Sequence, residues 1–303
     1  MTNRRFYRIT LFCFLFVTLC VGTVFTGWAR VGLMTLPVRE EIKIKIDRNM
    51  SALVQETRTI AVKQGRNTIE FNWPNMQIDF NTVQLQSLAD AKMGIKVLSM
   101  SIPPASKSSL LWEVESAQAG EMPMKLIYLT SGLGWICHYI ALIEETEDRL
   151  SLEAAIEVSN RTVEEYKDTV IKVDVIQPMT KSLKAGESKK ITFLTVANVP
   201  IEKGYISDPN LFGDAVAMQY IFKNDEKSGM GASMLLQGKV RIYKKDAASG
   251  GVGFIGEDVL PYVPNGGEIR LYAGTSRDIE VERKVMSSKR VNVRRDKKGR
   301  TVV

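Results

Sequence analysis

Apolar and polar residues alternate with a period of two along most of the chain. Residues 42–46 place an isoleucine at every second position, which is typical of a strand with one buried face. Comparable runs follow at 52–62, 68–71, 83–88 and 95–100. Glycine and asparagine within 63–67 predict a hairpin loop between the second and third of these runs. The pattern predicts an N-terminal β domain over residues 36–120, in which no segment keeps a helical apolar period.

Strand-length apolar runs continue at regular spacing through the second half of the chain. The charged segment 144–148 is predicted to form the turn of a hairpin, and helix is expected only in the leader and in a short turn near 163–167. This spacing indicates an all-β fold of tandem β domains, the second an immunoglobulin-like or related antiparallel β-sandwich over 121–303. The predicted strands are 124–130, 135–143, 150–158, 169–176, 190–196, 216–222, 238–243, 253–255 and 269–272, with a further one at Tyr205.

An uncharged apolar segment near the start of the chain bears on the compartment. Three arginines within residues 1–8 precede residues 9–25, which carry no charge, and the small residues Gly27 and Ala29 follow. This is the order of a secretory signal peptide, with cleavage after Ala29, and the segment also fits an uncleaved hydrophobic helix anchored in the inner membrane. Residues 1–29 are therefore predicted to be a signal peptide or an anchor. Both predictions place the body in the periplasm or at the cell surface.

The net charge of +7 is concentrated at the two ends. The leader contributes +3 and the tail from Arg283 onward contributes +8, which leaves −4 for residues 30–282. Only the tail is therefore a candidate for electrostatic contact with phosphate-bearing lipid or polysaccharide, and nucleic acid is not an expected partner of an exported protein. The tail residues that we single out as candidate contacts are Arg294, Arg295, Lys297 and Lys298.

Residue types that commonly carry chemistry are scarce. Cys137 is the only cysteine beyond the leader, so an internal disulfide is excluded. His138 is the only histidine, and on a strand it points away from its neighbour Cys137, so neither a histidine metal cluster nor a thiol–imidazole pair is expected. No catalytic, cofactor-binding or metal-binding residue is predicted. Trp135 is either a sandwich core residue or a sugar-stacking platform, and we take it as a candidate ligand contact.

Several segments resemble a family of proteins rather than only a pattern. Together they are similar to the domain of unknown function in the C-terminal part of mucoidy inhibitor A-like proteins, in the short form without a coiled-coil insertion. The resemblance implies tandem β domains on exported or surface proteins, brings no established catalytic residue, cofactor or ligand, and leads us to expect a copy truncated at its C-terminus. The segments that carry it are 53–58, 128–135, 150–160, 238–246, 254–258, 271–274 and 282–284.

The sequence thus predicts a non-enzymatic exported envelope protein that acts through binding or assembly. Its expected partner is another envelope protein or a polysaccharide, and membrane contact is expected only through an uncleaved leader. The alternative is an extracytoplasmic polysaccharide hydrolase with paired carboxylates, for which the acidic clusters at 144–148 and 225–226 are the candidates. No cofactor is expected.

Overall fold

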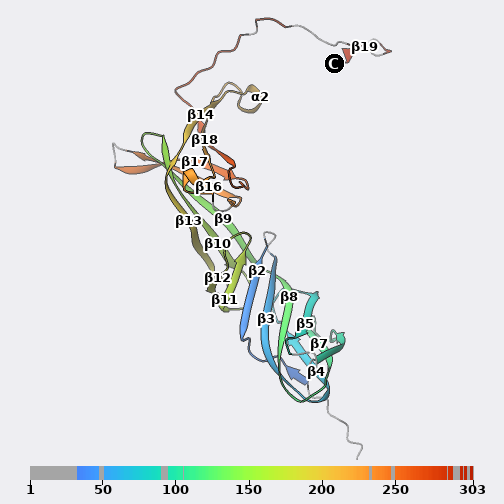
Figure 1. The fold of residues 1–303 in the computed structure, drawn as a ribbon. Helices are drawn as coiled ribbons and strands as arrows, with labels where there is room; N and C mark the ends of the chain where they lie inside the picture. Colours follow the sequence, from blue (N-terminus) through green and yellow to red (C-terminus); the bar gives the residue numbers. More distant parts are fainter. Residues whose placement is uncertain are drawn as a thin grey trace, which may run out of the picture. The chain divides into compact units, whose positions relative to one another are not determined.

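The fold was analysed in a computed structural model that describes residues 33–47, 51–89, 95–104, 106–231, 234–246, 250–284, 286–288, 294–295, 297–298 and 301–302. Its regular structure is almost entirely β, which confirms the predicted all-β class (Figure 1). The predicted leader helix, residues 1–29, lies outside the described residues. Within the described ranges, no helix is both long enough and apolar enough to cross a membrane.

The strands follow one another along the chain with short connections. In the first part they are β1 (Leu33–Thr35), β2 (Glu41–Ile46), β3 (Ser51–Val62), β4 (Gly65–Asn72), β5 (Ile78–Ser87), β6 (Ile95–Ser101), β7 (Ser109–Ser116) and β8 (Gly120–Ser131). They continue as β9 (Leu133–Ile143), β10 (Arg149–Asn160), β11 (Tyr166–Val173), β12 (Met179–Leu183), β13 (Ser188–Pro200), β14 (Glu202–Ile206), β15 (Ala217–Lys223), β16 (Gly238–Asp246), β17 (Gly251–Leu260), β18 (Glu268–Thr275), β19 (Arg294–Arg295) and β20 (Thr301–Val302). The helical turns are α2 (Pro209–Phe212) and η1 (Glu226–Ser228).

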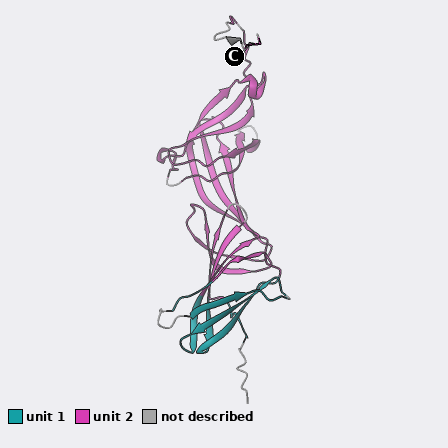
Figure 2. Ribbon diagram, turned by 90° about the vertical axis from the view of Figure 1, so that its right-hand side faces the viewer, with its two compact units in different colours: residues 1–38, 58–74, 85–124 teal, residues 39–57, 75–84, 125–303 magenta. Residues whose placement is uncertain are grey.

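The chain divides into two compact units that each draw on several segments (Figure 2). Unit 1 comprises residues 1–38, 58–74 and 85–124, and unit 2 comprises residues 39–57, 75–84 and 125–303. Three of the boundaries fall inside the strands β3, β5 and β8, so each of these strands contributes residues to both units.

Unit 1 contains a four-stranded sheet in the order β1-β4-β7-β6. Its core includes an aromatic cluster in which the Phe71 ring lies 4.9 Å from Trp73 and 6.3 Å from Trp112, measured between ring centroids. The predicted hairpin at 63–67 is wrong, because β4 pairs with β1 and β7, whereas β3 lies between β2 and β8 in another sheet. The buried Asn67 amide instead fixes a connection between sheets, donating to the Lys63 carbonyl at 2.7 Å.

Unit 2 contains most of a six-stranded sheet, β12-β11-β2-β3-β8-β5, together with a five-stranded sheet, β13-β10-β9-β16-β17, and a three-stranded sheet, β14-β15-β18. The hairpin predicted around 144–148 is present, because β9 and β10 pair antiparallel on either side of it. Two pairings are parallel, β2 with β11 and β9 with β16, so these sheets are mixed where the sequence predicted antiparallel strands. The helical turn predicted near 163–167 is also wrong, since β11 begins at Tyr166, and the two helical turns observed were not predicted.

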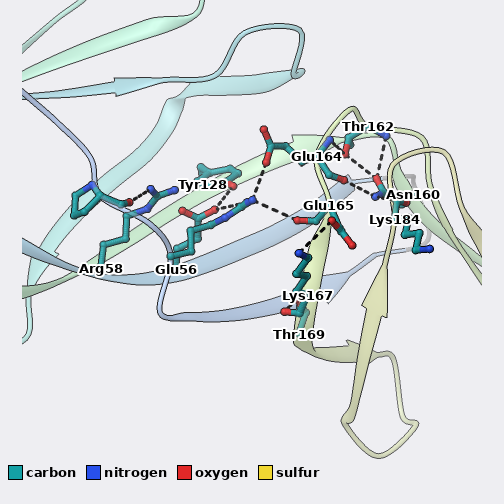
Figure 3. A network of polar contacts seen from close by, with 12 residues as sticks. Glu56, Arg58, Tyr128, Asn160, Thr162, Glu164, Glu165, Lys167, Thr169 and Lys184 are labelled. Atoms are coloured by element: carbon teal, nitrogen blue, oxygen red, sulfur yellow. Dashed lines mark hydrogen bonds and ion pairs between the residues drawn. The ribbon is translucent and has the colours of Figure 1, made fainter.

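A buried ionic cluster joins β3, β8 and the segment before β11 within unit 2 (Figure 3). The Glu56 side chain is 1% exposed and accepts hydrogen bonds from the Tyr128 hydroxyl at 2.7 Å and from Arg39 Nη1 at 3.3 Å. Arg39 Nη2 donates to Glu164 at 2.7 Å. Although burial disfavours its charge, Glu56 and Glu164 together raise the pKa of Arg39 above its ordinary value. Burial raises the pKa of Tyr128, so this hydroxyl remains a donor to Glu56.

The side chain of Asn160 fastens the segment that carries Glu164 (Figure 3). Its amide nitrogen donates to the carbonyls of Glu164 at 2.8 Å and Lys184 at 2.9 Å. Its amide oxygen accepts from the backbone nitrogen and the hydroxyl of Thr162. All hydrogen-bonding positions of this buried amide are thus used for structure, which is what burial of a polar group requires.

Candidate ligand-binding recess around Trp135

Trp135 lies near the start of β9 and is 5% exposed, so most of its surface is core. The rest of the indole lines a recess of about 570 Å³ that is built entirely from residues of unit 2. We call this the Trp135 recess. Its lining consists of an apolar part, Ile46, Leu53, Leu129 and Trp135, and a polar part, Lys45, Asp47, Ser51, Lys172 and Asp174.

The polar part of the recess arises from a lysine–apolar–aspartate triplet that occurs in two strands. Asp47 directly follows the end of β2 and Asp174 directly follows the end of β11, and these two strands run parallel. Their register places Lys45 directly opposite Lys172. The middle residue of each triplet is buried, at 2% and 0% exposure, so both lysines lie on the outer face of the sheet. The next strand continues the row, because Leu53 of β3 is opposite Lys45.

The two aspartates are held by their surroundings. Asp174 has a left-handed backbone with φ of 40°, and its Oδ2 accepts a hydrogen bond from the Tyr262 hydroxyl at 2.5 Å. The backbone nitrogen of Asp47 donates to the Ser51 carbonyl at 2.8 Å, which closes the end of the β2–β3 pair. The rim of the Trp135 recess is therefore fixed by contacts outside it.

Lys45 and Lys172 differ from Lys43 in having no carboxylate partner among the described residues. Lys43, two residues earlier on the same face of β2, forms an ion pair with Glu41 at 2.9 Å. Within the described part of the chain, Lys45 and Lys172 form no ion pair and no side-chain hydrogen bond. The recess is thus lined by two lysines at directly opposite positions of neighbouring strands, neither of which forms an ion pair with a described residue.

Trp135 also contributes to a second recess, of about 440 Å³, near the β9–β16 pair. There Cys137 is buried, whereas His138 is partly exposed with Nε2 3.3 Å from Glu157 Oε2. The alternation of β9 sends these adjacent side chains to opposite faces, as predicted, so they do not form a nucleophile–base pair. Gly238 is required in this wall, because a Cβ there would lie 2.4 Å from the Cys137 carbonyl oxygen.

The acidic cluster at 144–148 forms ion pairs with lysines. Glu147 accepts hydrogen bonds from Lys203 at 2.7 Å and from the Tyr220 hydroxyl at 2.7 Å, and Lys244 Nζ lies 3.0 Å away. Burial opposes ionisation, but the hydrogen bonds from Lys203, Tyr220 and Lys244 outweigh it and lower the pKa of Glu147 to about 2. A carboxyl group with this pKa does not act as the proton donor that a glycosidase needs.

The second acidic cluster has a local structural role. Asp225 caps η1 by accepting a hydrogen bond from the Ser228 backbone nitrogen at 2.9 Å, and that bond lowers the pKa of its carboxyl group. Glu226 lies in the first turn of η1. In the ranges that the structure covers, no three histidine, cysteine, aspartate or glutamate side chains are grouped so that they could hold a metal ion.

The basic tail residues singled out from sequence do not contribute to the recess. Arg294 and Arg295 form β19, which pairs with β20, and Lys297 and Lys298 lie exposed in the turn between them. The lining residues of the Trp135 recess include none of these four.

Sequence analysis identified Trp135 as a candidate contact but missed the lysines and aspartates beside it. The signal was the triplet at 45–47 and its counterpart at 172–174, yet nothing in the sequence indicates that strands so far apart pair in parallel. Comparison with known proteins adds no further assignment, because the chain matches no protein-family model and no curated protein.

Proposed function

We propose that the protein is an exported, non-enzymatic component of a bacterial-type cell envelope that acts by binding through the Trp135 recess. The observation that carries the proposal is the recess itself, which combines an indole edge and two leucines with four charged side chains. Such a mixture of apolar surface and a few converging polar groups is typical of ligand sites.

Export is inferred from the arginine-led apolar leader at residues 1–29. We infer membership of the mucoidy inhibitor A-like family from the segments quoted above. One of these segments, 128–135, spans the junction of β8 and β9 and contributes both Leu129 and Trp135 to the recess. We also propose that the second β domain is related to the immunoglobulin-like sandwiches, and the antiparallel neighbours β9, β10 and β13 support this relation.

A binding role is favoured over catalysis by the state of the reactive side chains. Glu147 is held ionised by its two lysines, and His138 lies beside Glu157 rather than beside Cys137. These contacts stabilise the fold and leave no proton donor paired with a nucleophile among them.

The experiment is capture of envelope material by the immobilised full chain. Polysaccharide and protein fractions of a native envelope are applied to the wild type, to Leu53→Gln and to Val163→Gln. Leu53 lines the recess, whereas Val163 is 57% exposed and does not line it, so we expect reduced retention only for Leu53→Gln. Equal retention by all three proteins, or release of shortened polysaccharide from the column, would contradict the proposal. Fractionation of cells that express the tagged chain tests export, and recovery in the cytoplasm would refute it.

A further inference from the structure

Lys45 and Lys172 place two like charges at directly opposite positions of neighbouring strands. Directly opposite residues in neighbouring strands are in side-chain contact range, and like charges in such positions are destabilising. Some other lysines of unit 2 have a carboxylate partner, for example Lys203 with Glu147 and Lys239 with Glu257. The fold therefore tolerates two directly opposite lysines without ion-pair partners in the Trp135 recess.

Protection of a sheet edge does not explain the pair. Lysines on edge strands prevent unwanted strand pairing, but β2 and β11 are interior strands, flanked by β3 and β12 in the order β12-β11-β2-β3. Solubility does not require the pairing either, because a lysine in one strand and a neutral residue in the other would serve as well. The pair therefore calls for another explanation than edge protection or solubility.

An anionic group is the natural occupant of the position between the two lysines. A carboxylate or phosphate accepts hydrogen bonds from both ammonium groups, and such charge-assisted bonds are stronger than neutral ones. The bound anion also offsets the repulsion between Lys45 and Lys172. The charge-assisted hydrogen bonds and the reduced repulsion therefore both favour binding.

The remaining side chains restrict the ligand further. Asp47 and Asp174 can only accept hydrogen bonds when ionised, which suits hydroxyl donors, and Ser51 can donate or accept. Leu53, Leu129 and the Trp135 indole offer an apolar surface beside them. With two aspartates beside two lysines the lining carries no net charge, so it does not attract an extended anionic surface such as a membrane, and an anion is held there only by direct contact with the two lysines.

We propose that the Trp135 recess binds a saccharide that carries one carboxylate or phosphate group. The anionic group lies between Lys45 and Lys172, the sugar hydroxyls donate to Asp47 and Asp174, and the apolar face of the ring contacts Leu53 and Trp135. The inference rests on the proposed binding function and adds the ligand class.

The test is calorimetric titration of the full chain with four probes: an oligouronate, the matching neutral oligosaccharide, a sugar phosphate and inorganic phosphate alone. We expect the charged saccharides to bind and the neutral one to bind at least about tenfold more weakly, since one charge-assisted hydrogen bond is worth about a factor of ten. The oligouronate and the sugar phosphate distinguish a carboxylate from a phosphate ligand.

Three substitutions locate the site. Lys45→Gln and Lys172→Gln should each weaken binding about tenfold, while Lys43→Gln, on the same face of β2, changes it less than about twofold. Thermal unfolding checks folding, and both recess variants should unfold at the same or a higher temperature than wild type. If a variant lost binding only because it was misfolded, its unfolding temperature would fall below that of the wild type. We expect no such fall for Lys45→Gln or Lys172→Gln.

Each result decides between the inference and the function on which it rests. Equal binding of charged and neutral saccharides, or binding insensitive to both lysine variants, overturns the anionic ligand. If none of the four probes binds but the Leu53→Gln variant still loses captured envelope material, the binding function stands and the saccharide inference fails. If neither probes nor envelope material bind, both fail.

Discussion

Replacing Glu147 by glutamine removes a carboxylate that connects several strands of unit 2. Its neighbours come from β14, β15 and β16, which supply Lys203, Tyr220 and Lys244. Glutamine keeps the size and can still accept a hydrogen bond from the Tyr220 hydroxyl, but it removes the charge that both lysines face. The substitution therefore isolates the electrostatic part of the cluster.

The size of the effect follows from the pKa of Glu147. A folded value of about 2 against the ordinary 4.5 corresponds to at most about 3 kcal/mol of stability at pH 7. The side chain is 20% exposed, and screening by solvent reduces this to about 1–2 kcal/mol. Because the folded pKa is the lower one, the contribution is complete above pH 4.5 and is lost as the pH falls toward 2. Slightly less than about half of this contribution to stability remains at pH 3.

Urea unfolding of the wild type and Glu147→Gln, followed by tryptophan fluorescence between pH 7 and pH 3, measures this contribution. The free-energy difference between the two proteins should be about 1–2 kcal/mol at pH 7 and shrink toward acid pH. Glu145→Gln is the control, because Glu145 is exposed in the same turn and makes no ion pair among the described contacts. A difference that is independent of pH, or one that Glu145→Gln reproduces, would refute the assignment of the stability to this carboxylate.

Two further substitutions test the packing of unit 2. Arg39→Ala leaves the buried carboxylate of Glu56 without its cation and should lower the free energy of unfolding by about 3–5 kcal/mol in urea at pH 7. Its control is Arg66→Ala, which breaks an exposed ion pair and should lower the free energy of unfolding by less than about 1 kcal/mol. Gly238→Ala forces β16 away from a backbone carbonyl of β9 and should cost about 1–3 kcal/mol in the same assay, while Gly256→Ala, which meets no atom within 4 Å, should be close to neutral. Similar costs within either pair of variants would show that the contacts named do not determine stability.

The local pattern of apolar and polar residues was sufficient to predict where the strands lie, but not which strands pair with one another. Ile42, Ile44 and Ile46 are all buried and the residues between them are exposed, as the alternation predicted, because burial of one strand face depends on the strand's own sequence. The hairpin at 63–67 was predicted from turn residues alone. Asn67 there uses its side chain to hold the connection, and β4 pairs with β1, which precedes it, and with β7, whose paired residues lie 37 to 51 positions later in the chain.

The recess shows the same limit. Trp135 could be selected from sequence because a tryptophan on a strand is either core or platform, and it is largely buried with one part lining the recess. Lys45 and Lys172 could not be selected, because each alone is an ordinary exposed lysine of a half-buried strand. Their significance comes from the parallel register of β2 and β11, which is a long-range property.

If the two lysines repel each other, their effects on stability cannot be independent. Strand burial offsets the repulsion, since Ile44, Ile46, Ile171 and Val173 are all at most 2% exposed. Lys45→Gln alone and Lys172→Gln alone should each raise the free energy of unfolding by about 0.5 kcal/mol, because either change removes the whole repulsion. The double variant should then gain no more than a single variant, and urea unfolding of the four proteins gives the coupling energy directly. Additive gains would mean that the ammonium groups do not interact, and the case for an anion between them would lose its main support.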